Sequence, residues 1–256
     1  MRHPVRSEYF KGTCGRLAAV TSLRHQRIQF VLILGGASLP FLAKIGVLLF
    51  GVTGYLLQSL YKIFQLIIPC LWRYREGKRR MSILWPTDAP LPSLRLLGIA
   101  TLVAVVLAGS AVAALQWIIP VWELDPAVIR AGFDARFAMG PLGAMTVVIF
   151  LSFANSALEE LHFRAWLDRE LSRIAGAPVG IGVSAAAFGC MHGLIFLGLP
   201  SFPPALVAAA VVGLMIAGAC WSLLVRQSGG IHAAWWSHGL SDALLLGWGL
   251  YWLGYV

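Results

Sequence analysis

Long apolar stretches place the strongest constraint on the fold of this chain. Residues 28–72 are apolar apart from Lys44 and Lys62, and these 45 residues are enough for two membrane crossings of about 20 residues each. Five more stretches of suitable length follow: 94–119, 141–172, 176–199, 205–225 and 231–254. A backbone in lipid must satisfy its own hydrogen bonds, so each stretch is expected to be helical. The sequence therefore predicts an all-α, polytopic transmembrane bundle of about seven spans, within a range of about six to eight.

The composition excludes an ordinary soluble domain. Hydrophobic residues make up 59% of the chain, charged residues make up 12%, and the mean hydropathy is +0.77. The net charge of +9 does not indicate a nucleic-acid partner, because eleven of the twenty Lys and Arg residues form two clusters, at 2–27 and 73–80, on either side of the first apolar stretch. Cytosolic flanks of membrane helices carry such clusters. We expect a multi-pass integral protein of a lipid bilayer, with the bacterial inner (plasma) membrane as its location.

Charge and hydropathy divide the chain into three regions. Residues 1–27 are interpreted as a basic cytosolic tail, because they carry six basic side chains against one acid. Residues 28–93 combine a transmembrane hairpin with a basic, proline-containing loop. Residues 94–256 hold the remaining spans. With the amino terminus inside, seven crossings would place the carboxyl terminus outside and the end of the fourth span toward the cytosol.

Few acidic side chains lie inside the predicted spans. Of the eleven acids, only Glu159, Glu160 and Asp242 do so, since Asp168 and Glu170 lie where the fourth helix continues past its span to about residue 172. Ionisable residues in membrane segments usually face a protein interior or a water-filled cavity and mark a functional site. On a helix, Glu160 and Arg164 are four residues apart and share a face. Glu159 points about 100° away and is left for another partner.

Two other spans contribute histidines. His192 lies within 176–199, and His238 shares a helical face with Asp242, four residues later. With the acidic pair, these groups can activate water, a carboxylate acting as general base and an imidazole sharing the proton. Two imidazoles with one or two carboxylates are also the donor set of a catalytic zinc site. The residues leave both alternatives open, and a divalent metal such as zinc would be held by Glu159, His192, His238 and Asp242.

Three motifs, each near or within a separate apolar span, resemble those of a known family. They are Glu159-Glu160-x-x-x-Arg164, Phe188-x-x-x-His192 and His238-x-x-x-Asp242. In this order they are similar to the motifs of the CPBP family of intramembrane proteases, which includes the type II CAAX prenyl endopeptidases and the bacterial relatives called Abi proteins. The resemblance covers roughly residues 94–254. It implies an endopeptidase that cleaves a membrane-associated peptide or protein near the membrane surface, a prenylated CAAX-like tail being one substrate class.

The resemblance also implies roles for the six residues. Glu159 and His192 would activate the hydrolytic water, and Glu160 with Arg164 would support the site. His238 with residue 242 would stabilise the oxyanion or orient the scissile carbonyl. Residue 242 is Asp where many family members have Asn, and an ionised Asp only accepts hydrogen bonds. An ionised Asp242 would therefore orient His238 or bind a metal, whereas a protonated one can still donate.

Other readings of the same residues predict other functions. Buried Glu, His and Asp also build proton relays, so a proton- or metal-coupled transporter is the alternative. Against it, the sequence has no detectable internal repeat of the kind many transporters show. A third possibility is a membrane adaptor of the same fold without catalytic activity. Such a protein would not need to keep charged and imidazole side chains, which are unfavourable within a membrane. Phe188, His162 and His232 are interpreted as packing or interfacial residues, and the oligomeric state is left open.

Overall fold

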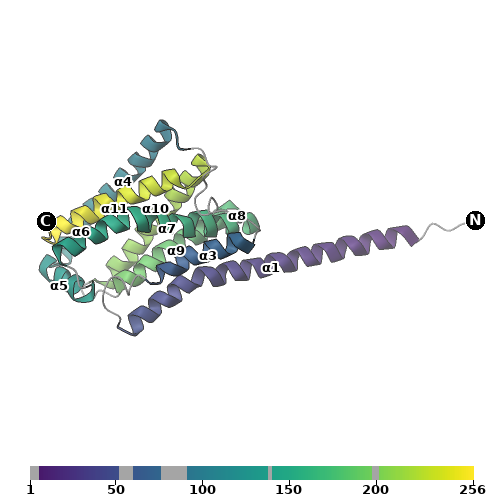
Figure 1. Ribbon diagram of the computed structural model, residues 1–256, viewed down its shortest axis with the longest axis horizontal. Coiled ribbons are helices and arrows are strands. Elements are labelled where there is room, and N and C mark those ends of the chain that lie inside the picture. The colour runs from purple at the N-terminus through teal and green to yellow at the C-terminus, as the bar shows by residue number, and fades with distance from the viewer. Residues whose placement is uncertain (1–5, 52–59, 76–90, 138–139, 198–201) are drawn as a thin grey trace, which may run out of the picture.

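The computed structural model describes residues 6–51, 60–75, 91–137, 140–197 and 202–256, and every regular element in those ranges is helical (Figure 1). This confirms the all-α fold class. In chain order the elements are α1 (Arg6–Leu49), α3 (Lys62–Arg75), α4 (Leu94–Val121), α5 (Pro126–Phe137), α6 (Pro141–Phe150), η2 (Leu151–Asn155), α7 (Ser156–Glu159), η3 (Glu160–Asp168), α8 (Arg169–Ala175), α9 (Ala177–Leu197), α10 (Pro204–Ser228) and α11 (His232–Trp252).

The segments α6, η2, α7, η3 and α8 form one continuous helical run from Pro141 to Ala175. Pro141 lies in its first turn, where the missing N–H of proline is not needed. The run ends at Gly176, whose φ of +90° is a conformation that glycine adopts without strain. Within the run, η2 and η3 are π-helical, a wide-turn form that is rare and frequent at functional sites. The two adjacent acids of the predicted site, Glu159 and Glu160, lie where α7 meets η3.

Five described helices are long and apolar enough to cross a membrane: Gln26–Leu49, Leu94–Val121, Pro141–Ala175, Ala177–Leu197 and Pro204–Ser228. They support an integral membrane protein, but the predicted count of seven spans is not confirmed. The second crossing of the 28–72 hairpin falls partly on residues 52–59, outside the described residues, and α3 has only 14 residues. The 21-residue α11 includes histidines, serines and an aspartate, which lower its hydropathy.

The helices extend into two segments that the sequence assigned to a tail and a connection. α1 begins at Arg6, so residues 6–27 continue the first membrane helix as helix, because each residue added to an existing helix gains one backbone hydrogen bond. The connection between residues 121 and 139 contains α5. Pro120, expected to end the third span, lies instead inside the last turn of α4.

Small residues bring the packed helices close together. α9 lies against α10, and α11 lies against α4. A Cβ atom at Gly189 of α9 would lie 2.6 Å from the carbonyl oxygen of Val211 in α10. On α4, the buried residues Ala100, Ala104 and Ala108 recur every four positions and form one face. Interfaces between membrane helices are enriched in such small side chains, because backbones can then approach closely.

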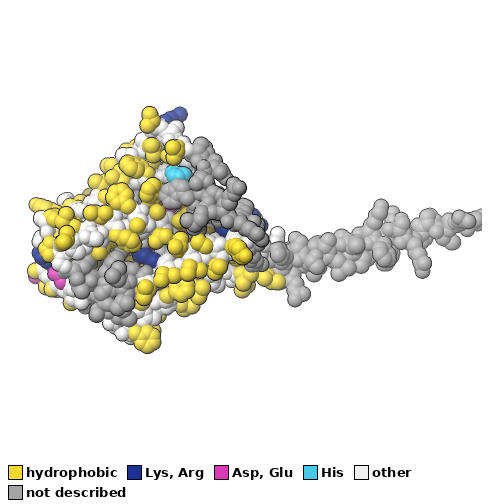
Figure 2. All heavy atoms as spheres, in the orientation of Figure 1, with side chains coloured by type: hydrophobic (Ala, Val, Ile, Leu, Met, Phe, Trp, Pro, Cys, Tyr) yellow, Lys and Arg dark blue, Asp and Glu magenta, His cyan; other side chains and the backbone are white. Residues whose placement is uncertain are grey.

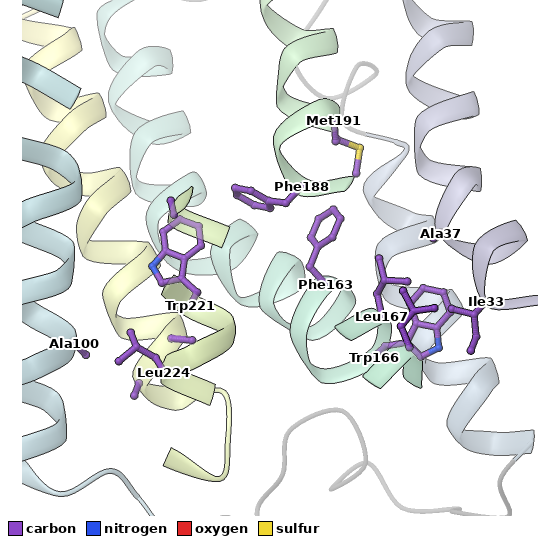
Figure 3. Packing of buried hydrophobic residues seen from close by; sticks show 14 of the residues in the cluster. Ile33, Ala37, Ala100, Phe163, Trp166, Leu167, Phe188, Met191, Trp221 and Leu224 are labelled. Carbon is purple, nitrogen blue, oxygen red and sulfur yellow. The ribbon is translucent and has the colours of Figure 1, made fainter. Parts of the chain in front are cut away.

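Aromatic side chains fill the core beside the continuous helix. The ring of Phe163 meets that of Phe188 edge-on at 5.4 Å, and Phe188 meets Trp221 edge-on at 5.5 Å (Figure 3). Trp166 belongs to the same buried cluster as Ile33 of α1 (Figure 3). The outer surface visible in Figure 2 is covered largely by hydrophobic side chains, as expected for a surface that meets lipid.

Candidate active site

Two adjacent carboxylates lie inside the helical bundle. Glu159 is the last residue of α7 and Glu160 the first of η3, and they are only 2% and 0% exposed. A buried charge is unfavourable unless it is paired. Glu160 Oε1 accepts a hydrogen bond from Nδ1 of His238 at 2.9 Å and lies 3.3 Å from Nη1 of Arg164. The Arg164 contact is the ion pair that the four-residue spacing predicts.

The two oxygens of Glu159 have different partners. Oε1 accepts a hydrogen bond from Nζ of Lys62, in α3, at 3.1 Å. Oε2 lies 3.8 Å from Nε2 of His192 and 3.6 Å from Nε2 of His238. The carboxylate is therefore anchored on one side and directed at both predicted histidines on the other.

A backbone hydrogen bond sets the tautomer of His192. Its Nδ1 lies 2.9 Å from the carbonyl oxygen of Phe188, one turn earlier. A carbonyl only accepts, so Nδ1 carries the hydrogen, and Nε2 of the neutral ring presents a lone pair toward Glu159. The Phe188 ring also packs on the imidazole, with centroids 4.4 Å apart. Phe188 thus packs as predicted and, in addition, orients His192 through its backbone.

His238 is held by a stacked ring and by carboxylates. Trp221 of α10 stacks on it, with centroids 3.9 Å apart and 14° between the planes. Because the carboxylate of Glu160 accepts from Nδ1, that nitrogen carries a hydrogen. Nε2 then faces Glu159 and Asp242, whose Oδ2 lies 3.6 Å away.

A glycine brings α11 against the helix that carries the acidic pair. A Cβ atom at Gly239 would overlap the backbone carbonyl oxygen of Ser152 in η2. The absence of a side chain at this position allows the close approach of the two helices. This approach places the neighbouring His238 within hydrogen-bonding distance of Glu160.

The guanidinium of Arg164 is buried among aromatic rings. Its central carbon lies 4.6 Å from the ring centroid of Phe188 and 5.2 Å from that of Trp221. A planar, delocalised cation stacks on such rings while it pairs with a carboxylate. Arg164 therefore links the aromatic core to Glu160.

The structure brings together all six residues predicted for the site, namely Glu159, Glu160, Arg164, His192, His238 and Asp242. Sequence reasoning did not predict the contributions of Lys62 and Trp221. The contribution of Lys62 could have been predicted, because a lysine within an apolar stretch needs an acidic partner. The contribution of Trp221 could not have been predicted, because a tryptophan near a helix end is equally typical of a membrane interface. His162 is buried, and its ring centroid lies 4.9 Å from that of Phe163, in agreement with a packing role.

Among the described residues, no group of three or more His, Cys, Asp or Glu side chains is placed to hold a metal ion. One oxygen of Glu159 is bonded to the Lys62 ammonium, which places a positive charge beside the point where a cation would bind. The arrangement therefore does not fit a preformed zinc centre. Zinc dependence stays a hypothesis from the sequence, and the chemistry proposed below uses the chain's own groups.

The fold and the site define an integral membrane protein with a buried centre of carboxylates and imidazoles, as hydrolysis inside a membrane requires. A family model described as type II CAAX prenyl endopeptidase Rce1-like matches residues 141–244, the segment that contains all six predicted residues. This segment is similar to the CAAX endopeptidases that the family model describes, and the match supports an enzyme of the hydrolase class. No curated protein and no solved structure matches the chain.

Proposed function

We propose that the chain is an intramembrane endopeptidase that hydrolyses a peptide bond of a membrane-associated peptide or protein near the membrane surface. One observation carries the proposal. Glu159 Oε2 lies 3.6 and 3.8 Å from the Nε2 atoms of His238 and His192, within a bundle of membrane helices. A carboxylate and an imidazole that converge on one point can bind a water molecule and remove its proton.

Glu159 and His192 activate the water. A water molecule between Glu159 Oε2 and the lone pair of His192 Nε2 would donate one O–H bond to each. Its oxygen lone pairs would then point away from both groups, toward the substrate. As the new C–O bond forms at the scissile carbonyl carbon, Glu159 takes the proton, and the carbonyl oxygen becomes an oxyanion. Fixed polar groups stabilise such charge better than mobile water does, because they need no reorientation during the reaction.

His238 stabilises the oxyanion. With Nδ1–H donating to Glu160, the imidazolium form of the ring can donate Nε2–H to the developing negative charge. The carboxylates around the ring balance its positive charge. When the intermediate collapses, the C–N bond breaks and the amine leaving group takes the proton from Glu159. The products are a new carboxyl end and a new amino end.

Asp242 orients His238 and marks the accessible side of the site. Its side chain is 25% exposed and that of His192 is 20% exposed, whereas that of Glu159 is 2% exposed. Substrate is therefore expected to arrive from the side of His192 and Asp242. An ionised Asp242, whose Oδ2 lies 3.6 Å from Nε2 of His238, attracts the imidazolium and leaves its Nε2–H to donate to the substrate oxyanion.

The proposed substrate class is a lipid-anchored peptide with a prenylated Cys-aliphatic-aliphatic-Xaa end, because the matching family is described by that activity. We propose a bacterial inner membrane as the location, with the site open toward the cytosol. Membrane peptides without a prenyl group are the second substrate class there.

The test compares purified wild type with Glu159→Gln in detergent. Each is incubated with a farnesylated CAAX peptide and, separately, with a peptide library, and the products are identified by mass spectrometry. Loss of the general base should lower cleavage by about 10²–10⁴-fold. Glu170→Gln is the matched control, because Glu170 is a buried carboxylate of the same helical run whose partners, Arg169 and Arg173, lie outside the site.

Each outcome discriminates between mechanisms. Full cleavage by Glu159→Gln would overturn the proposal. Absence of cleavage by wild type, together with proton flux in proteoliposomes that requires Glu159, would favour the transporter. Loss of wild-type cleavage on adding a zinc chelator, with recovery on adding zinc, would assign a metal to the site.

A further inference from the structure

Lys62 contacts the candidate catalytic base from outside the family segment. It lies in α3, whereas the family model matches residues 141–244. Its Nζ atom lies 3.1 Å from Glu159 Oε1, and the two side chains are 10% and 2% exposed. We propose that Lys62 is a positioning residue of the active site, which fixes the Glu159 carboxylate so that Oε2 faces the two imidazoles. This inference rests on the proposed function of Glu159.

The first argument is geometric. The terminal torsion of a Glu side chain is broad and roughly two-fold, so an unrestrained carboxylate can exchange its two oxygens. Lys62 distinguishes them, because its ammonium donates to Oε1 at 3.1 Å. Oε2 then lies within 3.8 Å of both Nε2 atoms, where the water would be activated. A carboxylate without this anchor would spend less time in the reactive orientation.

The second argument is electrostatic. Two neighbouring buried carboxylates repel each other, and each needs a cation to remain ionised. Arg164 serves Glu160 from the same helical run, at 3.3 Å. Lys62 serves Glu159 from α3. The two acids of the motif are thus each paired with a separate buried cation, and only one of these cations belongs to the family motif.

The position of Lys62 is itself supported by packing. Its ammonium lies 5.0 Å from the ring centroid of the preceding residue, Tyr61. The ammonium of Lys44 in α1 lies 5.4 Å from the same centroid, but it does not hold Lys62 in place, because like charges repel. An aromatic face attracts a cation at such distances. Tyr61 is only 4% exposed, and α3 packs against α7 and η3. The amino-terminal helices therefore hold Lys62 against the site.

The test measures kcat and KM for Lys62→Met, which removes the charge and keeps a long side chain. The substrate is the farnesylated CAAX peptide or, if that peptide is not cut, the library peptide that wild type cleaves fastest. We expect kcat to fall at least about tenfold, with KM within about twofold, because the interaction acts on the base and not on substrate binding. Lys62→Arg should recover part of the lost kcat. Lys44→Met is the matched control: it removes a buried lysine beside the same ring and should keep the wild-type kcat.

The outcomes separate this inference from the proposed function. Where wild type cleaves and Glu159→Gln does not, an unchanged kcat in folded Lys62→Met, or a change in KM alone, overturns the role of Lys62. An equal loss in Lys44→Met also overturns it, because the effect would then be structural. If Lys62→Met does not yield folded protein, Lys62→Leu decides: its side chain neither donates nor carries a charge, and a wild-type kcat would again overturn the role. Cleavage by Glu159→Gln would instead remove the proposed function, and the inference with it.

Discussion

At the scale of single residues, the site is organised by buried ion pairs and by hydrogen bonds that assign protons. The spacing of Glu160 and Arg164 predicts their pairing, because residues four apart share a helical face. The same spacing leaves Glu159 pointing elsewhere, and the structure gives it Lys62 and two imidazoles as neighbours. Local spacing therefore predicts the first ion pair but not the second, whose members are 97 residues apart in sequence.

Arg164→Lys tests whether the planar cation matters as well as its charge. Lys keeps the charge but loses the stacking on Phe188 and Trp221, which is worth about 2 kcal/mol for a desolvated cation. We expect a lower melting temperature because the stacking is lost, and less cleavage because Arg164 no longer fixes Glu160, which holds His238. Arg173→Lys is the control, because the Arg173 side chain is 53% exposed. Equal stability and activity of the two variants would contradict the stacking role.

At the scale of elements, the site depends on how closely helices approach one another. The continuous run from Pro141 to Ala175 carries both acids, and its π-helical segments flank α7. α9 and α11 each bring one imidazole of the candidate site, His192 and His238. The apolar stretches predict these helices but not the π-helical turns. A π-helical turn requires no particular residue type, so the apolar pattern of the sequence does not reveal it.

Gly239→Ala tests the approach of α11. The added methyl group would overlap the Ser152 carbonyl and push α11 away from η2, moving His238 from Glu160. A displacement of about 1 Å can lower a rate by about 10²-fold, so cleavage should fall by that order in protein that still purifies as a folded species. Gly247→Ala on the same helix is the control, because its new Cβ would meet no atom within 4 Å. Equal cleavage by both variants would show that close approach is not required.

At the scale of the whole molecule, the amino-terminal helices pack against the helical run that carries the two adjacent acids. The family segment begins at residue 141 and does not include residues 1–140, yet α3 packs against α7 and η3 and supplies Lys62. α1 also packs against α3 and α8. From the sequence, residues 28–93 are assigned to a separate region. Hydropathy indicates where the chain crosses the membrane, but it does not indicate which helices contact one another.

Membrane topology gives a prediction at the same scale. If α3 and α11 cross the membrane together with the five candidate helices, seven crossings place the two termini on opposite sides. A reporter fused after Val256 should then be active only on the outer side, and one fused before Met1 only on the cytosolic side. The pair of fusions controls for expression. A cytosolic reporter after Val256 would require an even number of crossings.

The sequence by itself determined the membrane-embedded helical fold, because long apolar stretches can satisfy their backbone only as helices in lipid. It also predicted six side chains for the site, because charged and imidazole groups are unfavourable in a membrane and often mark a functional site there. Only the tertiary structure decided which oxygen of Glu159 faces the histidines, which tautomers they adopt, and that Lys62 and Trp221 complete the site. Those features arise from contacts between helices distant in sequence, and no local pattern encodes such distances.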